Sequence, residues 1–158
     1  MFDKKAIKAG FSRAASDYDA NAKLQETIRK KAVAVAERYF SQTARETARV
    51  LDIGCGTASL SQEKKDWDIV GVDISLGMCE VARRKTANII NADATFLPFA
   101  DNSFDYVFSS LVLQWIDRPE LMIKEALRVL KTDGVAVVTT FVKGTLQELA
   151  EAFSAVDN

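Results

Sequence analysis

The sequence predicts an α/β fold in which a mostly parallel central sheet is covered by helices on both faces. Three features support this prediction: short apolar segments alternate with amphipathic ones, the connections between them are brief, and a glycine-rich turn follows the first apolar segment. Successive parallel strands need helical crossovers, so this alternation indicates repeated βα units. Ligands of such sheets bind beyond the carboxyl ends of the strands, at the point where the strand order reverses.

The length and composition fit a single globular domain over residues 1–158. The chain is 48% hydrophobic and 27% charged, and it is long enough for one core but too short for two. No apolar run approaches the roughly 18 residues that span a bilayer, and the first residues are too charged for a secretory signal. We therefore expect a soluble, cytoplasmic protein that binds neither membranes nor nucleic acid.

The cysteines and the absence of histidine restrict the chemistry. Cys55 and Cys79 lie far apart without a CxxC spacing, and the chain has no histidine. This pattern predicts neither a disulfide scaffold nor a metal site. It also removes the usual general base.

Positive charge is concentrated in the first third of the chain. Residues 1–49 carry 11 Lys or Arg against 6 Asp or Glu, a balance of +5, so the remainder carries −6. A solvated helical face is the simpler explanation, and a basic docking surface for an acidic partner is the alternative. If the surface docks a partner, reversing the charges of Arg29, Lys30 and Lys31 should change the kinetics with that partner.

Each expected element has a local signal. Ile28, Ala32 and Val35 recur at helical steps in the segment 22–40, Ser75 can cap a helix, and Pro119 fits a first helical turn. The expected strands are 50–53, 68–72, 88–91, 104–108 and 135–140. The expected helices are a short helix or ordered arm over 2–20, then 22–40, Ser75 through Ala82, Pro119 to a stop at Asp133-Gly134, and 145–156, with a polar link at 41–47.

The turn after the first strand points to an adenosine ligand with a cationic tail. Gly54 and Gly56 match two positions of the dinucleotide fingerprint, but Ser59 stands where the third glycine belongs. Asp52, directly before the turn, would repel a pyrophosphate and attract an ammonium group or a positive sulfur. Asp73 follows Gly54 by 19 residues, at the end of the second strand, where a carboxylate can accept hydrogen bonds from ribose hydroxyls.

The chain resembles class I S-adenosylmethionine-dependent methyltransferases in four successive motifs over residues 50 to about 141. These motifs are VLDIGCGTAS, VGVDIS, NADATFLPFADNSFDYVFSSLVLQW and LKTDGVAVVTT. The resemblance implies a Rossmann-like fold with S-adenosylmethionine as cofactor and S-adenosylhomocysteine as product. It divides the domain into a helical arm (1–48), a cofactor-binding core (49–141) and a C-terminal helix (142–158). Ala58 departs from the family's usual GxGxG.

The same resemblance implies specific cofactor contacts. The glycine turn would cradle the methionine and ribose portion, Asp73 would bind the ribose, and Asp93 would recognise the adenine amino group. The positions that match cofactor contacts of the family are Asp52, Gly54, Cys55, Gly56, Asp73, Ile74, Met78, Asp93 and Ala94.

A narrower resemblance concerns the malonyl-acyl-carrier-protein O-methyltransferases of biotin synthesis. It is carried by FSRAASDYDANAKLQ, SSLVLQWIDRP and TTFVKGTLQELAEAFSAVDN. It implies that the arm closes over the cofactor and that acyl carrier protein presents the acceptor. The residues implied are Tyr18 and Ser109 on the cofactor side, and Gln25, Leu111, Gln114 and Trp115 on the acceptor side. A carboxylate acceptor is already a nucleophile, so methyl transfer needs alignment and exclusion of water rather than a strong base.

Three other functions stay open at this stage. The acceptor could be another small molecule, or the chain could be a non-catalytic S-adenosylmethionine-binding module. A third alternative is an NAD-dependent oxidoreductase, against which Asp52 and Ser59 argue. The family domain continues beyond its fifth strand with two antiparallel strands and an acceptor lid. Since the sequence ends at Asn158, we expect these strands to be missing.

Overall fold

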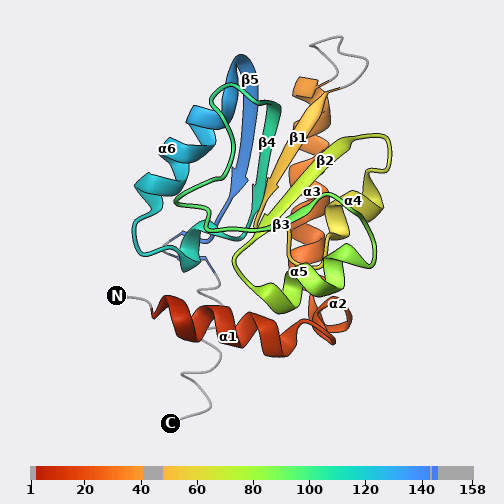
Figure 1. Ribbon diagram of the computed structural model, residues 1–158. Coiled ribbons are helices and arrows are strands. Elements are labelled where there is room, and N and C mark those ends of the chain that lie inside the picture. The colour runs from red at the N-terminus through yellow and green to blue at the C-terminus, as the bar shows by residue number, and fades with distance from the viewer. Residues whose placement is uncertain (1–2, 41–47, 143, 146–158) are drawn as a thin grey trace.

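The sheet of the protein is parallel and doubly wound, as predicted. The computed structural model describes residues 3–40, 48–142 and 144–145. Within them, five strands lie in the order β3-β2-β1-β4-β5, and every adjacent pair is parallel (Figure 1). The strands are β1 (Arg49–Ile53), β2 (Asp68–Asp73), β3 (Ile89–Asn91), β4 (Phe104–Ser110) and β5 (Leu130–Thr139). The order reverses between β1 and β4, which places the expected ligand site at their carboxyl ends.

Helices cover both faces of this sheet. They are α1 (Lys4–Ala14), α2 (Tyr18–Asn21), α3 (Lys23–Phe40), α4 (Ser59–Glu63), α5 (Leu76–Arg83) and α6 (Pro119–Val129), with a short 3₁₀ helix, η2 (Leu113–Trp115). The prediction of a single helix or arm over 2–20 is resolved into α1 and α2. Figure 1 shows α1 lying across the end of the sheet toward which the strands point.

The pleat of the central strands explains why both faces are buried. Val50 in β1 and Tyr106 in β4 pack against α3, whereas their neighbours Leu51 and Val107 pack against α6. Successive side chains of a strand point to opposite faces, so a strand covered on both sides must be apolar almost throughout. All residues of β4 from Phe104 to Ser109 are accordingly buried.

The boundary between α6 and β5 differs from the prediction. The helix ends at Val129 and the strand begins at Leu130, so Asp133-Gly134 does not stop a helix. It lies instead in an irregular stretch of β5, where the pairing with β4 shifts register. Gly134 is required there because a Cβ would lie 2.6 Å from the Leu130 side chain. The predicted helix 145–156 and the link 41–47 fall outside the described residues, apart from Thr145.

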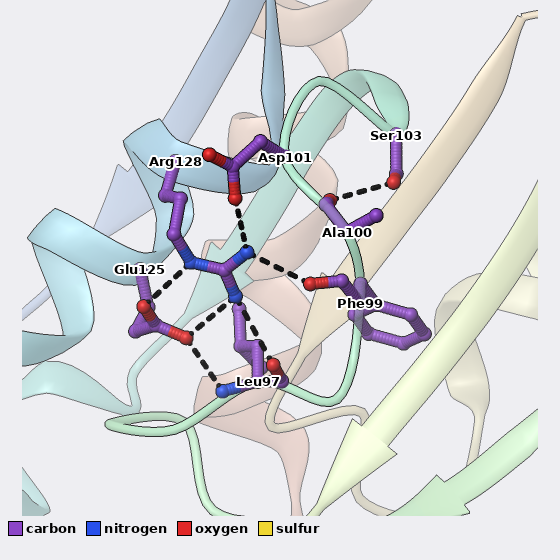
Figure 2. Close-up of polar contacts among 7 residues, drawn as sticks. All are labelled: Leu97, Phe99, Ala100, Asp101, Ser103, Glu125 and Arg128. Carbon is purple, nitrogen blue, oxygen red and sulfur yellow. Dashed lines mark hydrogen bonds and ion pairs between the residues drawn. The ribbon is translucent and has the colours of Figure 1, made fainter.

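Arg128, near the end of α6, holds the loop that precedes β4 (Figure 2). Its guanidinium donates to the carbonyl oxygens of Leu97 at 3.1 Å and Phe99 at 2.8 Å, and to the carboxylates of Asp101 and Glu125. Glu125 also accepts from the Leu97 N–H at 2.7 Å. This polar cluster fixes the segment that continues from the predicted adenine site.

The described residues contain neither a membrane-spanning helix nor a metal-binding cluster of side chains. None of these helices is long and apolar enough to cross a membrane. In the same part of the chain, no group of three or more His, Cys, Asp or Glu side chains is arranged to hold a metal ion.

Candidate functional site

A cavity lies at the carboxyl ends of the central strands, beneath the N-terminal arm. It combines the glycine turn after β1, the ends of β2 and β3, the segment after β4, and residues of α1, α2 and α3. The predicted site residues that line it are Tyr18, Gln25, Gly54, Gly56, Asp73, Ile74, Met78, Asp93, Ala94, Leu111, Gln114 and Trp115. Motifs from the whole length of the core thus meet in one place.

The glycines of the turn are required by both conformation and space. Gly54 has φ +72° and Gly56 has φ +52°, in the left-handed region that side chains disfavour. A Cβ on Gly54 would lie 2.1 Å from Cγ2 of Val112, which also lines the cavity. Ala58 also adopts a left-handed conformation, with φ 62°, and is fully buried. The turn therefore forms with alanine at the position where the family has glycine.

Asp73 fixes the turn as well as lining the cavity. Its Oδ2 accepts from the Gly56 N–H at 3.0 Å, and its Oδ1 accepts from the Ser75 N–H at 2.8 Å. Burial raises the pKa of the Asp73 carboxyl, and these two hydrogen bonds oppose the rise. Because a carboxylate has about four lone-pair sites, further donors can still be accepted.

Asp93 lines the same cavity, just after the neighbouring strand β3, and contacts the arm. Its Oδ1 accepts from the Thr95 N–H at 2.9 Å and from the Thr95 hydroxyl at 2.8 Å, while its Oδ2 pairs with Lys4 Nζ at 2.5 Å. Burial opposes ionisation, but the bonds from Lys4 and Thr95 outweigh it, and the pKa of Asp93 is lowered. An ionised acceptor is thus held ready at the end of β3.

Asp52, Cys55 and Ser109 lie behind the cavity wall rather than on it. Asp52 shares the α3 face of β1 with Val50; burial and the nearby Asp73 raise its pKa to about 7, against the influence of Arg29. Cys55 is buried beside Gly71, and burial raises its thiol pKa, so it is not a reactive thiolate. The Ser109 hydroxyl donates to the Ile53 carbonyl at 3.1 Å. Direct contact of these three with a ligand stays a prediction.

The segment after β4 supplies an apolar wall with one fixed amide. Gln114 accepts at Oε1 from the Thr140 hydroxyl at 3.1 Å. Leu111 has φ 59°, which turns the chain sharply at the end of the strand. The Trp115 indole meets the Phe11 ring edge-on, with centroids 5.5 Å apart and planes at 89°. This contact connects the acceptor-side wall to α1.

The sequence predicted that the arm closes over the cofactor, but it did not identify the α1 residues that line the cavity. Lys4, Ile7 and Phe11 all line it. The spacing of Ile7 and Phe11, four residues apart, is a signal that could have identified an inward face. No comparable signal identified Lys4, because its partner Asp93 lies 89 residues away in the sequence.

The seat of α1 on α5 is unusually close. The Ser12 and Ser75 hydroxyls are 2.8 Å apart, and a Cβ on Gly77 would lie 2.8 Å from the Ser12 carbonyl oxygen. A side chain at position 77 would therefore push the arm away from the core.

A family model described as a methyltransferase domain matches residues 51–138. The malonyl-[acyl-carrier protein] O-methyltransferase of Enterobacter lignolyticus is 37% identical, over 98% of this chain and 61% of its own length. The biotin biosynthesis bifunctional protein BioHC of Cellvibrio japonicus is 37% identical, over 99% of this chain and 31% of its own length.

The fold comparison agrees with the sequence comparison. The crystal structure of a SAM-dependent methyltransferase from Thermotoga maritima matches with a TM-score of 0.66 and 25% identity, covering 90% of this chain and 68% of that one. The chain spans less than two thirds of the length of the two curated relatives.

Proposed function

The chain belongs to the methyltransferase domain family, and from that membership we propose that it binds S-adenosylmethionine and transfers the methyl group to a carboxylate. The observation that carries this proposal is the joint presence of the glycine turn, Asp73 and Asp93 in one cavity at the switch point of the sheet. When bound, the cofactor supplies a methyl group on a positively charged sulfur.

The donor and acceptor groups of the cavity fit this cofactor. Asp73 can accept from ribose hydroxyls with the lone pairs that Gly56 and Ser75 leave free, and Asp93 can accept from the adenine amino group. The apolar side chains of Ile74 and Met78 suit the faces of a purine ring. The glycine turn brings backbone close to the ligand, where no side chain intervenes.

We further propose that the acceptor is the free carboxylate of a malonyl group on acyl carrier protein, in biotin biosynthesis. The names of the relatives support this choice. The chemistry of the wall supports it too: the titratable side chains of the cavity are Lys4, Tyr18, Asp73 and Asp93, and none belongs to the acceptor-side segment 110–116. An acceptor that is already ionised needs no base there.

The charge of α1 suits an acidic carrier protein better than that of α3. Between Lys4 and Ala14, α1 has no acidic residue, and Lys5, Lys8 and Arg13 are exposed. In α3, by contrast, two of the three cations Arg29, Lys30 and Lys31 are in ion pairs, Arg29 with Glu63 and Lys30 with Glu26. Exposed cations steer association more than they add affinity. We therefore place the basic docking surface on α1, directly over the cavity.

Calorimetric titration is the first test of this function. The protein should bind S-adenosylhomocysteine and not NAD. Binding of NAD alone would contradict the proposal.

Turnover then tests the acceptor. Malonyl-acyl carrier protein should be methylated in preference to a panel of small carboxylates and hydroxyl compounds, and preference for a small molecule would contradict the carrier-protein assignment. Cofactor binding with no turnover on any acceptor would favour a non-catalytic binding module.

The docking surface has a separate test with a matched control. The double variant Lys5→Glu/Lys8→Glu should raise the KM for the carrier protein and weaken its salt dependence, with S-adenosylhomocysteine affinity unchanged. Lys65→Glu is the control, since Lys65 is also exposed but precedes the amino end of β2, away from the cavity. Equal effects of the two changes would contradict a specific surface.

A further inference from the structure

Asp19, in the short helix α2, bonds to the glycine turn from outside the cavity. Its Oδ1 accepts from the Thr57 hydroxyl at 2.5 Å and from the Ser59 hydroxyl at 3.4 Å, and its Oδ2 accepts from Lys85 Nζ at 2.6 Å. Thr57 directly follows Gly56 and is only 2% exposed. One carboxylate therefore connects the arm, the turn and the chain just beyond α5.

We propose that Asp19 is a positioning residue for cofactor binding, which locks the arm onto the glycine turn and thereby holds Tyr18 against the cavity. This inference rests on the proposed function. Asp19 does not line the cavity, whereas Tyr18, the residue before it, does. Neither Asp19 nor Thr57 is among the site residues predicted from the sequence.

The geometry of α2 explains how one residue acts through the other. Consecutive side chains of a helix diverge by about 100°, so Asp19 can face the turn while Tyr18 faces the cavity. The helix has only four residues and no side-chain cap bond at its start. A single turn of this length is not stable alone. Its orientation therefore depends on contacts with the rest of the chain, among them those of Asp19 and the edge contact between Tyr18 and Phe11, whose ring centroids are 6.4 Å apart.

The donors around Asp19 require a carboxylate rather than any acceptor. Burial raises its pKa, but the hydrogen bonds from Lys85 and Thr57 together with the Lys85 charge outweigh it, and the pKa is lowered. Both oxygens accept hydrogen bonds, Oδ1 from two hydroxyls and Oδ2 from an ammonium group. An asparagine would offer one oxygen, and its NH₂ group would face a donor on the other side. Asp19→Asn should therefore break one of the two connections with almost no change in volume.

The polar contacts of α1 are made with other segments, so α2 needs an anchor of its own on the turn. Lys4 contacts Asp93, and Ser12 contacts Ser75, so α1 is attached to the segments after β3 and β2. Among the described residues, the side-chain bonds that connect the arm to the turn after β1 are those of Asp19. Its loss would leave α1 seated and release α2.

The test compares Asp19→Asn with Asp17→Asn, the same change two residues earlier, where the side chain makes no cap hydrogen bond to α2. Asp19→Asn should weaken S-adenosylhomocysteine binding about tenfold, as expected for loss of a charged hydrogen-bond partner. Asp17→Asn should stay within about twofold. Thr57→Val should weaken S-adenosylhomocysteine binding as much as Asp19→Asn does, whereas Thr57→Ser should keep the wild-type affinity. The double variant Asp19→Asn/Thr57→Val should bind no more weakly than either single variant.

A double-mutant cycle with Tyr18→Phe separates positioning from general stability. Tyr18→Phe should weaken binding in the wild-type background and have no effect in the Asp19→Asn background, because Tyr18 is no longer held in place. Additive effects of the two changes, or wild-type affinity of Asp19→Asn, would overturn the proposal.

A ligand-free measurement keeps this inference distinct from the proposed function. Trypsin should cleave at Lys23, just after α2, faster in Asp19→Asn than in Asp17→Asn. If the wild type binds no S-adenosylhomocysteine, the proposed function fails, and the proteolysis alone then decides whether Asp19 anchors the arm. Equal cleavage of the two variants would overturn the anchor.

Discussion

The carboxylate of Asp73 accepts a hydrogen bond from the backbone N–H of Gly56 at 3.0 Å, so the acid at the end of β2 holds the turn that leaves β1. The parallel register makes this contact possible, because Ile53 lies opposite Val72 and the two strands end side by side. One side chain thus serves both as a predicted ribose ligand and as part of the frame around it.

Asp73→Asn should weaken S-adenosylhomocysteine binding by roughly 1 to 3 kcal/mol, which is about 5- to 150-fold, because a charged acceptor is lost at both the turn and the ligand. Asp68→Asn is the control, since Asp68 is the exposed first residue of the same strand. Titration calorimetry measures both. An unchanged affinity in Asp73→Asn would remove Asp73 from the cofactor site.

Gly77→Ala should release α1 from α5. Alanine stabilises a helix interior relative to glycine by roughly 0.5 to 1 kcal/mol, so a loss of stability here must come from the contact with Ser12, which a Cβ would approach at 2.8 Å. Thermal unfolding and limited proteolysis of the arm would measure this effect.

Gly10→Ala is the matched control for that change, because a Cβ on Gly10 of α1 meets nothing within 4 Å. It should be neutral or stabilising by about 0.5 to 1 kcal/mol. If proteolysis of the arm is slower in Gly77→Ala than in Gly10→Ala, the close approach of Gly77 to Ser12 is unimportant.

Asp52 should make the protein less stable as the pH rises from about 4 to 7. Its pKa is raised from 3.8 to about 7 in the folded protein by burial and by Asp73. In that window the folded state keeps a proton that the unfolded chain releases, so the free energy of unfolding falls. At about 1.4 kcal/mol per pKa unit, Asp52→Asn should gain roughly 2 to 3 kcal/mol relative to the wild type between pH 5 and 7. Denaturant titrations at the two pH values test this. The prediction is contradicted if the free energy of unfolding changes equally with pH in the wild type and in Asp52→Asn.

Arg128→Ala should lower the Tm more than Arg118→Ala does. Arg128 donates to two loop carbonyls and two carboxylates (Figure 2). Arg118, by contrast, contacts Glu120 in an exposed pair. Arg128→Lys should recover only part of the loss, because an ammonium group cannot reproduce the forked geometry of a guanidinium. Thermal melts of the three variants would show whether the order holds.

Ala58→Gly should stabilise the protein by about 1 kcal/mol. Ala58 is held at φ 62° and ψ 36°, where a Cβ costs roughly 1 to 2 kcal/mol, and glycine removes this strain. Chemical unfolding measures the gain, and a lower stability of Ala58→Gly would mean that the buried methyl group matters more than the strain.

The sequence predicted the strands well because each one is a run of apolar residues with its own boundaries. It failed at Val129 and Leu130, where an amphipathic helix passes directly into a strand and the same apolar residues satisfy both periods. The site could be predicted for a related reason. The motif residues Gly54, Asp73 and Asp93 follow parallel strands, and the carboxyl ends of such strands must lie together.

The arm could not be predicted in the same way. The seat of α1 depends on the space between Gly77 and Ser12, and the anchor of α2 depends on Thr57, all of which are tertiary contacts. Asp52 shows a different limit. It precedes the turn in sequence, but the alternation of the strand points it toward α3, so nearness to the motif did not place it on the cavity wall.

The ion pair between Lys4 and Asp93 also has a consequence for biosynthesis, since it joins residues 89 positions apart. At roughly 5 to 20 residues per second, the ribosome needs about 5 to 20 s to add the segment that α1 contacts. Helix α1 is therefore made well before the segment that carries Asp93, and until that segment is complete the inner face of α1, with Ile7 and Phe11, is open to chaperones and proteases.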